Sequence, residues 1–383
     1  MFDFLSDKTA SLMIRLSAEN REVSREELAS SDMRALYELC LEHELHGVVA
    51  SHILNDGIAA LPDYWLRAYE KEQERLDFLK KKSREICSVM RENGIPMVIL
   101  KNGGIMTDIV SDAAACPMED IDSLVRKEDF FKAHDILVKN GFIFKFRSDF
   151  EKEILAEAYA DGSTEYYILM PDGEKMWFEL SWRAVAGRWI RPDKEPPTDE
   201  LFSRSYFSEG TDVGILNAED NLLQVCIHTA KHSYVRSPGL RLHLDVDRIV
   251  SNKQIDWDIF IERVKKTRVK TSTYYSLLIP KVLFGTSIPN NVLERLKPRK
   301  CKAKRIEKLL KKAGLLHPVG RKFSKFEFLR FQTSLYDSVG DMIRVIYPSY
   351  SWYKQRYGIK CALALPYYIA LRALDLVGIR KKK

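Results

Sequence analysis

Three acidic residues on two expected strands have the types and spacing needed to bind divalent metal ions. Asp120 and Asp122 are two positions apart in an extended segment, so their side chains point to the same side of a strand. Two convergent carboxylates supply the hard oxygen ligands that Mg²⁺ prefers, and substrate phosphates complete the coordination. Glu179 lies on a later strand and would add a third carboxylate if the two strands are neighbours. The pattern predicts a site for two Mg²⁺ ions, with Mn²⁺ as the alternative metal, suited to in-line phosphoryl displacement.

A glycine-containing turn precedes these acids and has the chemistry of an anion site. Lys101, Asn102, Gly103 and Gly104 follow a buried apolar run and lead into an expected helix. Backbone N–H groups at such a junction bind phosphates, and glycine lets a phosphate approach the backbone closely. We therefore expect this turn to hold phosphate groups, with the Lys101 ammonium adding a positive charge.

The elements that must position these residues follow from apolar patterns and turn residues. Residues 97–100 and 121–125 are typical of buried strands, whereas residues 105–110 and 126–140 are typical of helices. The turn chemistry of residues 171–173 predicts a hairpin, and the third acid lies on its second strand.

The fold class expected from these elements is α+β (mixed α/β). A core at 94–215 carries the acids and the glycine turn, and helical regions at 1–93 and 216–383 flank it.

Helical regions before and after this core are predicted from apolar periodicity. Residues 64–90 form one long amphipathic pattern, which Asn93 and Gly94 are expected to end. Asn217 is expected to cap the first helix after the core. Residues 326–346 give a second long helical pattern near the carboxyl end.

The combined pattern resembles the uncharacterised nucleotidyltransferase family of the DNA polymerase β-like superfamily. The resemblance rests on residues 99–104, 117–125 and 178–182, and continues at 228–232 and 241–245. It implies a small polymerase β-like core, NTP as a substrate and two Mg²⁺ ions.

The resemblance also implies roles for individual residues. Asp120 and Asp122 correspond to ligands of both metals, Glu179 to the third carboxylate, and Lys101 with the 102–104 turn to the phosphate-binding segment. Three positions depart from the family pattern, since Asn102 replaces a glycine, Cys116 an arginine and Ser181 a histidine. These departures leave room for a catalytically inactive descendant.

Two histidines lie downstream with helical spacing. His228 and His232 are four residues apart and would share one helix face. A zinc pair is one interpretation, but the glutamate of the HExxH motif is missing and no third ligand is evident. The resemblance covers both histidines together with Arg241 and Asp245. We therefore favour lining of a substrate cleft, or a buried His–Asp hydrogen bond, over a metal site.

The function predicted from these residues is transfer of a nucleoside monophosphate from an NTP to an acceptor hydroxyl. One alternative is a toxin-type nucleotidyltransferase of the abortive-infection class, which also has a lysine and two glycines before an aspartate pair. Another is a catalytically inactive module that binds a nucleotide and docks a partner. The sequence selects neither the acceptor nor the base of the NTP.

The distribution of charge along the chain indicates a second binding surface. The chain has 383 residues and a net charge of +7. Residues 295–325 hold thirteen Lys and Arg residues but one acid, Glu307, so a net +12 lies in this stretch and the remainder of the chain is slightly acidic. A stretch this basic is a candidate site for a polyanion.

The same composition predicts where the protein resides. Six scattered cysteines and an acidic amino-terminal start favour the cytoplasm and indicate no secretory signal. No stretch is long and apolar enough for a transmembrane segment. The apolar carboxyl end at 361–383, which finishes in Arg and Lys residues, is a candidate for peripheral membrane contact.

Overall fold

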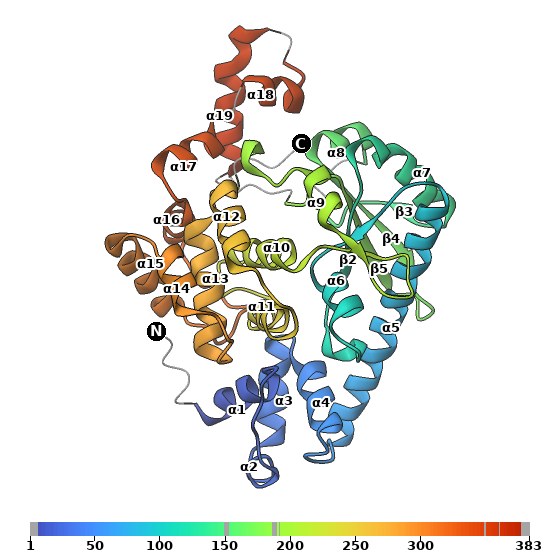
Figure 1. The fold of residues 1–383 in the computed structure, drawn as a ribbon, viewed down its shortest axis with the longest axis vertical. Helices are drawn as coiled ribbons and strands as arrows, with labels where there is room; N and C mark the ends of the chain where they lie inside the picture. Colours follow the sequence, from blue (N-terminus) through green and yellow to red (C-terminus); the bar gives the residue numbers. More distant parts are fainter. Residues whose placement is uncertain are drawn as a thin grey trace.

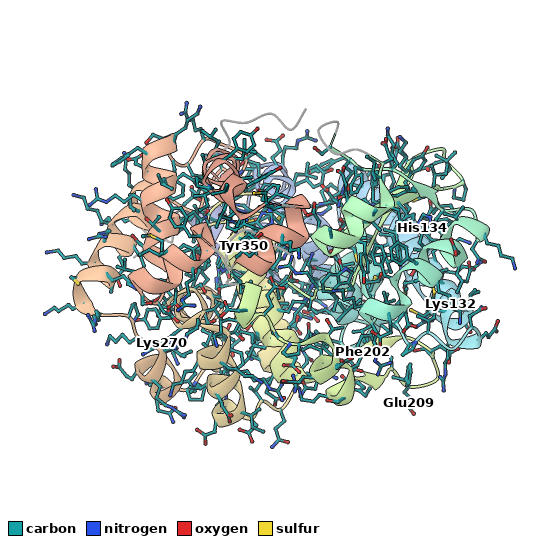
Figure 2. The ribbon with its side chains drawn as sticks, turned by 90° about the horizontal axis from the view of Figure 1, so that it is seen from above. Lys132, His134, Phe202, Glu209, Lys270 and Tyr350 are labelled. Carbon is teal, nitrogen blue, oxygen red and sulfur yellow. The ribbon has the colours of Figure 1, made fainter. Side chains whose placement is uncertain are left out.

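The structure is a computed structural model with an α/β part beside a helical part. It describes residues 7–148, 153–185, 190, 192–347, 350–359 and 361–376. Figure 1 shows the sheet on one side, helices α10–α14 facing it, and the amino-terminal helices along one end. Figure 2 shows the same division from above, with Lys132 and His134 on the sheet side and Lys270 on the opposite side. This architecture confirms the predicted α+β class with helical flanks.

Five helices precede the sheet, and capping residues define the beginnings of three of them. They are α1 (Lys8–Ser17), α2 (Arg25–Ala29), α3 (Met33–Glu42), α4 (His46–Asn55) and α5 (Asp63–Glu92). Asp7, Ser24 and Asp32 each accept a hydrogen bond from a first-turn N–H group. Helix α5 confirms the long helix predicted over 64–90, and it ends where Gly94 adopts a positive φ of 75°.

A seven-stranded mixed sheet lies at the centre of the α/β part, in the order β3-β4-β5-β2-β1-β7-β6. The strands are β1 (Val98–Ile99), β2 (Asp120–Leu124), β3 (Ile143–Phe144), β4 (Ser163–Leu169), β5 (Lys175–Ser181), β6 (Tyr206–Phe207) and β7 (Gly214–Ile215). Strand β2 is parallel to β5 and antiparallel to β1. The predicted hairpin is β4–β5, which turns at Gly173 with a φ of 86°.

Four further helices connect the strands, and two of them begin elsewhere than expected. They are α6 (Lys101–Asp108), α7 (Phe130–Lys139), α8 (Leu155–Asp161) and α9 (Thr198–Arg204). The helix expected at 105–110 begins at Lys101, so the expected turn is the first helical turn. The helix expected from residue 126 begins with a 3₁₀ turn at Lys127–Asp129, a common way for a helix to start.

Helices alone follow the sheet in the described residues. They are α10 (Ala218–Lys231), α11 (Arg241–Asn252), α12 (Trp257–Thr267), α13 (Lys270–Leu283), α14 (Asn290–Leu296), α15 (Lys300–Ala313), α16 (Lys325–Leu335), α17 (Val339–Ile346), α18 (Tyr350–Tyr357) and α19 (Leu365–Leu376). Asn217 caps α10 as predicted, since its side chain accepts from the Asp220 N–H group. The single helix predicted over 326–346 is wrong, because Ser338 caps a new helix after Leu335.

One apolar core runs through the amino-terminal helices, the sheet and the helices α10–α16. Leu76 of α5, Ile121 of β2, Leu222 of α10 and Val246 of α11 belong to the same buried cluster. A shared core does not mark domain limits, so the proposed division of the chain at 93 and 215 stays a prediction. Among the described helices, none combines the length and apolar character needed to cross a bilayer. The basic end of the stretch proposed for membrane contact, 377–383, lies outside the described residues.

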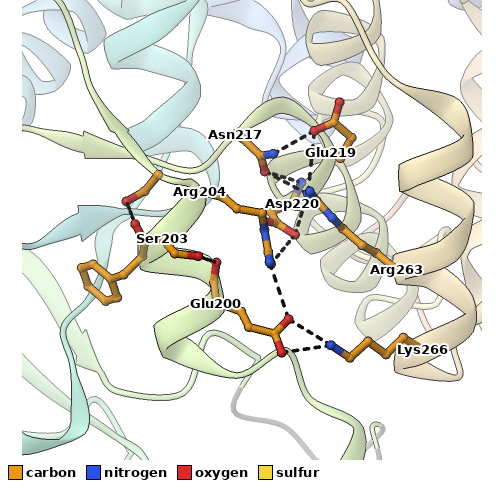
Figure 3. Close-up of polar contacts among 10 residues, drawn as sticks. Glu200, Ser203, Arg204, Asn217, Glu219, Asp220, Arg263 and Lys266 are labelled. Carbon is orange, nitrogen blue, oxygen red and sulfur yellow. Dashed lines mark hydrogen bonds and ion pairs between the residues drawn. The ribbon is translucent and has the colours of Figure 1, made fainter.

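A polar network centred on the buried Asp220 links α9, on the sheet side, to α10 and α12 of the helical part (Figure 3). The Asp220 carboxylate on α10 accepts from Arg204 of α9 at 2.7 Å and pairs with Arg263 of α12 at 2.9 Å. Lys266 of α12 pairs with Glu200 of α9 at 2.9 Å. Charges on three helices thus link the α/β part to the helical part.

Removing the central carboxylate should destabilise the fold. Asp220 is 4% exposed, so Asp220→Ala leaves Arg204 and Arg263 without their shared partner. We expect the free energy of unfolding to fall by about 3 kcal/mol, because breaking a buried ion pair strands a charge. Urea unfolding measures this. Asp258→Ala, which removes an exposed aspartate paired with Arg295, should cost less than about 1 kcal/mol; equal losses would contradict the prediction.

Candidate active site

A polar cleft lies between the sheet and the helical part, with a volume of about 280 Å³. One wall comes from β2, β5 and the start of α6, and the other from the end of α10 and the start of α11. Cations and carboxylates share its lining, in which the central residues are Lys101, Asp120, Asp122, Glu179, Lys231 and Arg241. The cleft therefore brings residues of the α/β core together with residues of the helical part.

The register of β2 and β5 brings the three predicted carboxylates to this cleft. Asp122 lies directly opposite Glu179 in the parallel pair, and Asp120 lies opposite Trp177. Residues opposite one another on neighbouring strands point to the same face. Burial raises the pKa of Asp122, and the nearby Glu179 carboxylate raises it further, whereas Lys101 opposes both. Three acids close together and partly shielded from water need a positive partner.

Two cationic side chains, Lys101 and Arg147, contact these acids in the structure. The Lys101 ammonium lies 2.5 Å from an Asp122 oxygen, and the Arg147 guanidinium lies 2.5 Å from an Asp120 oxygen and 3.1 Å from Glu165. Burial alone would lower the pKa of Lys101, but Asp122, Glu179 and Asp120 raise it above its ordinary value. Protein cations thus lie against two of the three acids, Asp120 and Asp122.

The donor set fits Mg²⁺ in type, since carboxylate oxygens are its usual protein ligands. Within the residues that the structure describes, no group of three or more His, Cys, Asp or Glu side chains is arranged to hold a metal ion. Lys101 and Arg147 both end flexible side chains. Metal ligation by Asp120 and Asp122 would therefore replace the two ion pairs.

The residues of the predicted phosphate turn divide into two groups. Lys101 and Asn102 line the cleft, whereas Gly103 and Gly104 are buried. A Cβ atom would lie 2.6 Å from the Ile99 side chain at Gly103, and 3.0 Å from the Ile99 carbonyl oxygen at Gly104. The two glycines thus let α6 pack on β1, and the expectation that they form an open turn is wrong.

Lys101 and Glu44 are the two cleft-lining residues with a left-handed backbone, and Lys101 is the one in the predicted phosphate turn. It has a positive φ of 52° at the first position of α6. This left-handed conformation is uncommon for a residue with a side chain and gathers at functional sites. Lys101, rather than either glycine, is therefore the conformationally unusual residue beside the acids.

Comparison with known protein families gives one match, which covers most of the chain. The model of the uncharacterised nucleotidyltransferase family matches residues 29–285. The chain belongs to this family. The match supports nucleotidyl transfer in general, and a nucleotide as substrate. No curated protein and no solved structure matches significantly. The matched residues include the whole sheet and both walls of the cleft, but not the basic stretch at 295–325.

The three departures from the nucleotidyltransferase pattern all have local partners. Asn102 donates to the Pro117 carbonyl at 3.2 Å and to Asp245 at 3.1 Å. The Cys116 thiol is buried and contacts the Asn102 carbonyl at 3.4 Å. Ser181 donates to Glu179 at 3.1 Å. These residues hold the segment before β2 and the third carboxylate in place.

His228 and His232 both line the cleft, as does Arg241. The two rings pack edge to face with centroids 4.9 Å apart, and His232 Nδ1 lies 2.6 Å from the Ser237 carbonyl. Burial lowers the pKa of His228 and lowers that of His232 to about 4, so both imidazoles are neutral near pH 7.

Asp245 differs from the sequence expectation. It is buried behind the cleft, where it accepts from Asn102, and one of its oxygens has no hydrogen-bond partner. The predicted His–Asp hydrogen bond is therefore wrong at this residue. Arg241 donates to the Pro117 carbonyl, so Asp245 and Arg241 both support the segment that leads into β2.

The charged cleft residues that sequence reasoning missed include Glu44, Arg147 and Lys231. Lys231 lies between the two predicted histidines, and its position on the last turn of α10 was the available signal. Arg147 follows β3, and only the pairing of β3 with β4 brings it beside Glu165 and Asp120. No local motif marks Arg147 or Glu44.

Buried histidines outside the cleft predict an acid-sensitive fold. Burial lowers the pKa of His52 and of His243 to about 4 and that of His43 to about 3, from 6.5. The unfolded chain binds more protons between these values, so stability is full above pH 6.5 and is lost as pH falls toward 4.

We expect the free energy of unfolding to drop by at least about 2 kcal/mol between pH 7 and pH 5. Urea unfolding at both values measures it. His52 Nδ1 lies 2.7 Å from the Leu16 carbonyl, which an asparagine amide can also reach. His52→Asn should therefore narrow the difference by about 1 kcal/mol or more. An unchanged difference would show that His52 does not couple folding to pH.

Proposed function

We propose that this protein is a Mg²⁺-dependent nucleotidyltransferase that transfers a nucleoside monophosphate from an NTP to an acceptor hydroxyl and releases pyrophosphate. The observation that carries the proposal is the alignment of Asp122 with Glu179 on parallel strands, with Asp120 on the same side and Lys101 against them. Membership of the nucleotidyltransferase family supports the same chemistry.

The reaction assigns distinct tasks to the cleft residues. The acceptor oxygen bonds to the α-phosphorus as the bond from that phosphorus to the bridging oxygen breaks, so pyrophosphate leaves with the electron pair. Glu179 receives the acceptor proton. Lys101 moves from Asp122 to the triphosphate and offsets its charge. Bound Mg²⁺, held by the three carboxylates, would neutralise the triphosphate and lower the pKa of the acceptor hydroxyl.

A nucleotide-binding module without catalysis is the second candidate. It is favoured by the ion pairs that Lys101 and Arg147 make with Asp122 and Asp120, because such pairs satisfy the acids without a metal. In that case the cleft would hold a nucleotide by its cations alone, and the helical part would dock a partner.

Calorimetric titration with each NTP, with and without Mg²⁺, separates the two functions. A transferase should bind its NTP more tightly with Mg²⁺, and should release pyrophosphate when cell extract supplies the acceptor. Labelled NTP then identifies the modified product. Nucleotide binding that ignores Mg²⁺, with no pyrophosphate released, would instead favour the module.

A further inference from the structure

A second hollow opens beside the active-site cleft and is basic. We call it the basic groove; its volume is about 630 Å³. Its cations are Arg236, Arg321, Lys322 and Lys325, and none of the described residues that line it is acidic. Three of the four belong to the basic stretch identified in the sequence. The structure thus gathers part of that stretch around one concave surface.

The basic groove adjoins the cleft through a single residue. Ser237 lines both hollows. Its N–H group donates to the Pro318 carbonyl at 3.0 Å, and its own carbonyl lies 2.6 Å from His232 Nδ1. Ser237 is thereby fixed between the floor of the groove and a residue of the cleft. An extended ligand that fills the groove would meet the cleft at Ser237.

The cations of the groove have different roles. The Lys322 ammonium donates to the Gly314 carbonyl at 3.2 Å and to the Leu316 carbonyl, so it fixes the loop between α15 and α16. Arg321 and Lys325 are exposed at the mouth of the groove. The nearest acid on α16, Glu327, caps its own helix and pairs with Lys312. A net positive surface is left facing solvent.

Aromatic rings accompany these cations. The Arg236 guanidinium lies over the Phe328 ring, 5.8 Å from its centroid, and Phe323 also lines the groove. Phe326 on the adjoining turn is 73% exposed. Cations that follow a phosphate backbone, interleaved with rings on which bases stack, are typical of surfaces that bind single-stranded nucleic acid. An acidic protein would use the cations but not the rings.

We propose that the basic groove binds a single-stranded nucleic acid whose terminal sugar hydroxyl enters the cleft past Ser237. The groove then supplies the acceptor of the transfer reaction, and this part rests on the proposed function. Binding of the strand itself does not. The terminal hydroxyl attacks the α-phosphorus as described above, so no additional reactant is required.

Fluorescence anisotropy with labelled 12-residue RNA and DNA single strands tests the binding directly. The host is the full chain carrying Asp120→Asn and Asp122→Asn, so that no transfer occurs. Replacing Arg321 and Lys325 with serine should weaken binding about tenfold and flatten the plot of log affinity against log salt by about 1.4, as expected for two lost phosphate contacts on a single strand. Preference for RNA or DNA identifies the strand type.

Two controls separate this site from general positive charge. Lys139→Ser with Lys265→Ser removes the same charge from exposed positions outside the groove and should leave the affinity unchanged. Phe328→Leu should weaken the single strand but not inorganic polyphosphate, which has no bases. Thermal unfolding of each variant shows that it is folded.

The outcomes either support or overturn the proposal. Equal losses in the groove variant and the Lys139/Lys265 variant, or binding that does not depend on salt, would overturn it. If polyglutamate binds as tightly as the oligonucleotide and Phe328→Leu has no effect, the ligand of the groove would be an acidic protein and not a nucleic acid. Strand binding at the groove without nucleotide transfer by the wild type would keep the groove and refute the proposed function. If the wild type releases pyrophosphate but the groove variant binds the strand as tightly as its host, the proposed function would stand and the groove proposal would be refuted.

Discussion

The double variant Asp120→Asn with Asp122→Asn should lose nucleotide transfer almost completely, with kcat/KM reduced about 10⁴-fold. Both residues lie on β2 facing the cleft, and Asp122 is 8% exposed. Asparagine keeps the volume of each side chain but removes the charge that would hold Mg²⁺ in the proposed reaction. Pyrophosphate release under a fixed NTP concentration measures the loss.

The fold should survive this change, because each lost charge has a flexible partner. Lys101 and Arg147 end long side chains that can turn toward Glu179 and Glu165. We therefore expect thermal unfolding to shift by only a few degrees. Asp199→Asn with Asp258→Asn, at two exposed aspartates that pair with Arg126 and Arg295, should keep full activity. Full activity in the Asp120/Asp122 variant would refute the mechanism.

Local patterns were enough to find the acids, since the geometry of a strand is regular. The spacing of Asp120 and Asp122 fixes their common side wherever the strand lies. The hairpin turn at Gly173 similarly fixes where β5 begins. Pairing of β2 with β5 was the one long-range assumption, and the register that places Asp122 opposite Glu179 bears it out. The metal itself stays a prediction.

The features that sequence patterns mispredicted or missed depend mostly on packing between distant segments. Gly103 and Gly104 have the composition of a phosphate loop, but their closeness to Ile99 makes them packing glycines. Arg147 reaches Asp120 only after β3 has paired with β4. The long apolar pattern over 326–346 hid a helix boundary, because Ser338 caps a helix without interrupting the periodicity.

The basic stretch illustrates the same division between composition and contact. Its charge was evident from composition alone. However, the Lys322 ammonium donates to loop carbonyls, and Lys312 forms an ion pair with Glu327. Arg236 joins the same surface from a segment almost 60 positions before the stretch begins. The charge of the sequence therefore indicated that a polyanion binds, whereas the structure indicates where it would bind, in the groove beside Ser237.

Lys101→Met should be the second most damaging change at the active site. The ammonium is the cation that contacts the acids from α6, and its left-handed backbone directs it at Asp122. Losing a charged contact to the triphosphate in a partly dry cleft should lower kcat/KM about 1000-fold. Steady-state kinetics at varied NTP concentration measures the loss, and Lys101→Arg should recover only part of it because a guanidinium is larger and planar.

A purely structural role for Lys101 predicts a different result. In that case Lys101→Met would lower the unfolding temperature, since Asp122 would lose its partner, while the folded fraction would bind the NTP with unchanged affinity. Calorimetric titration at a temperature where both proteins are folded distinguishes the two roles, and Lys265→Met on the exposed face of α12 controls for loss of a surface lysine. If Lys101 holds phosphate, affinity falls in Lys101→Met alone. Unchanged affinity and turnover would leave Lys101 as the counter-ion of Asp122, and the phosphates would have to be bound by the cations of the opposite wall, Lys231 and Arg241.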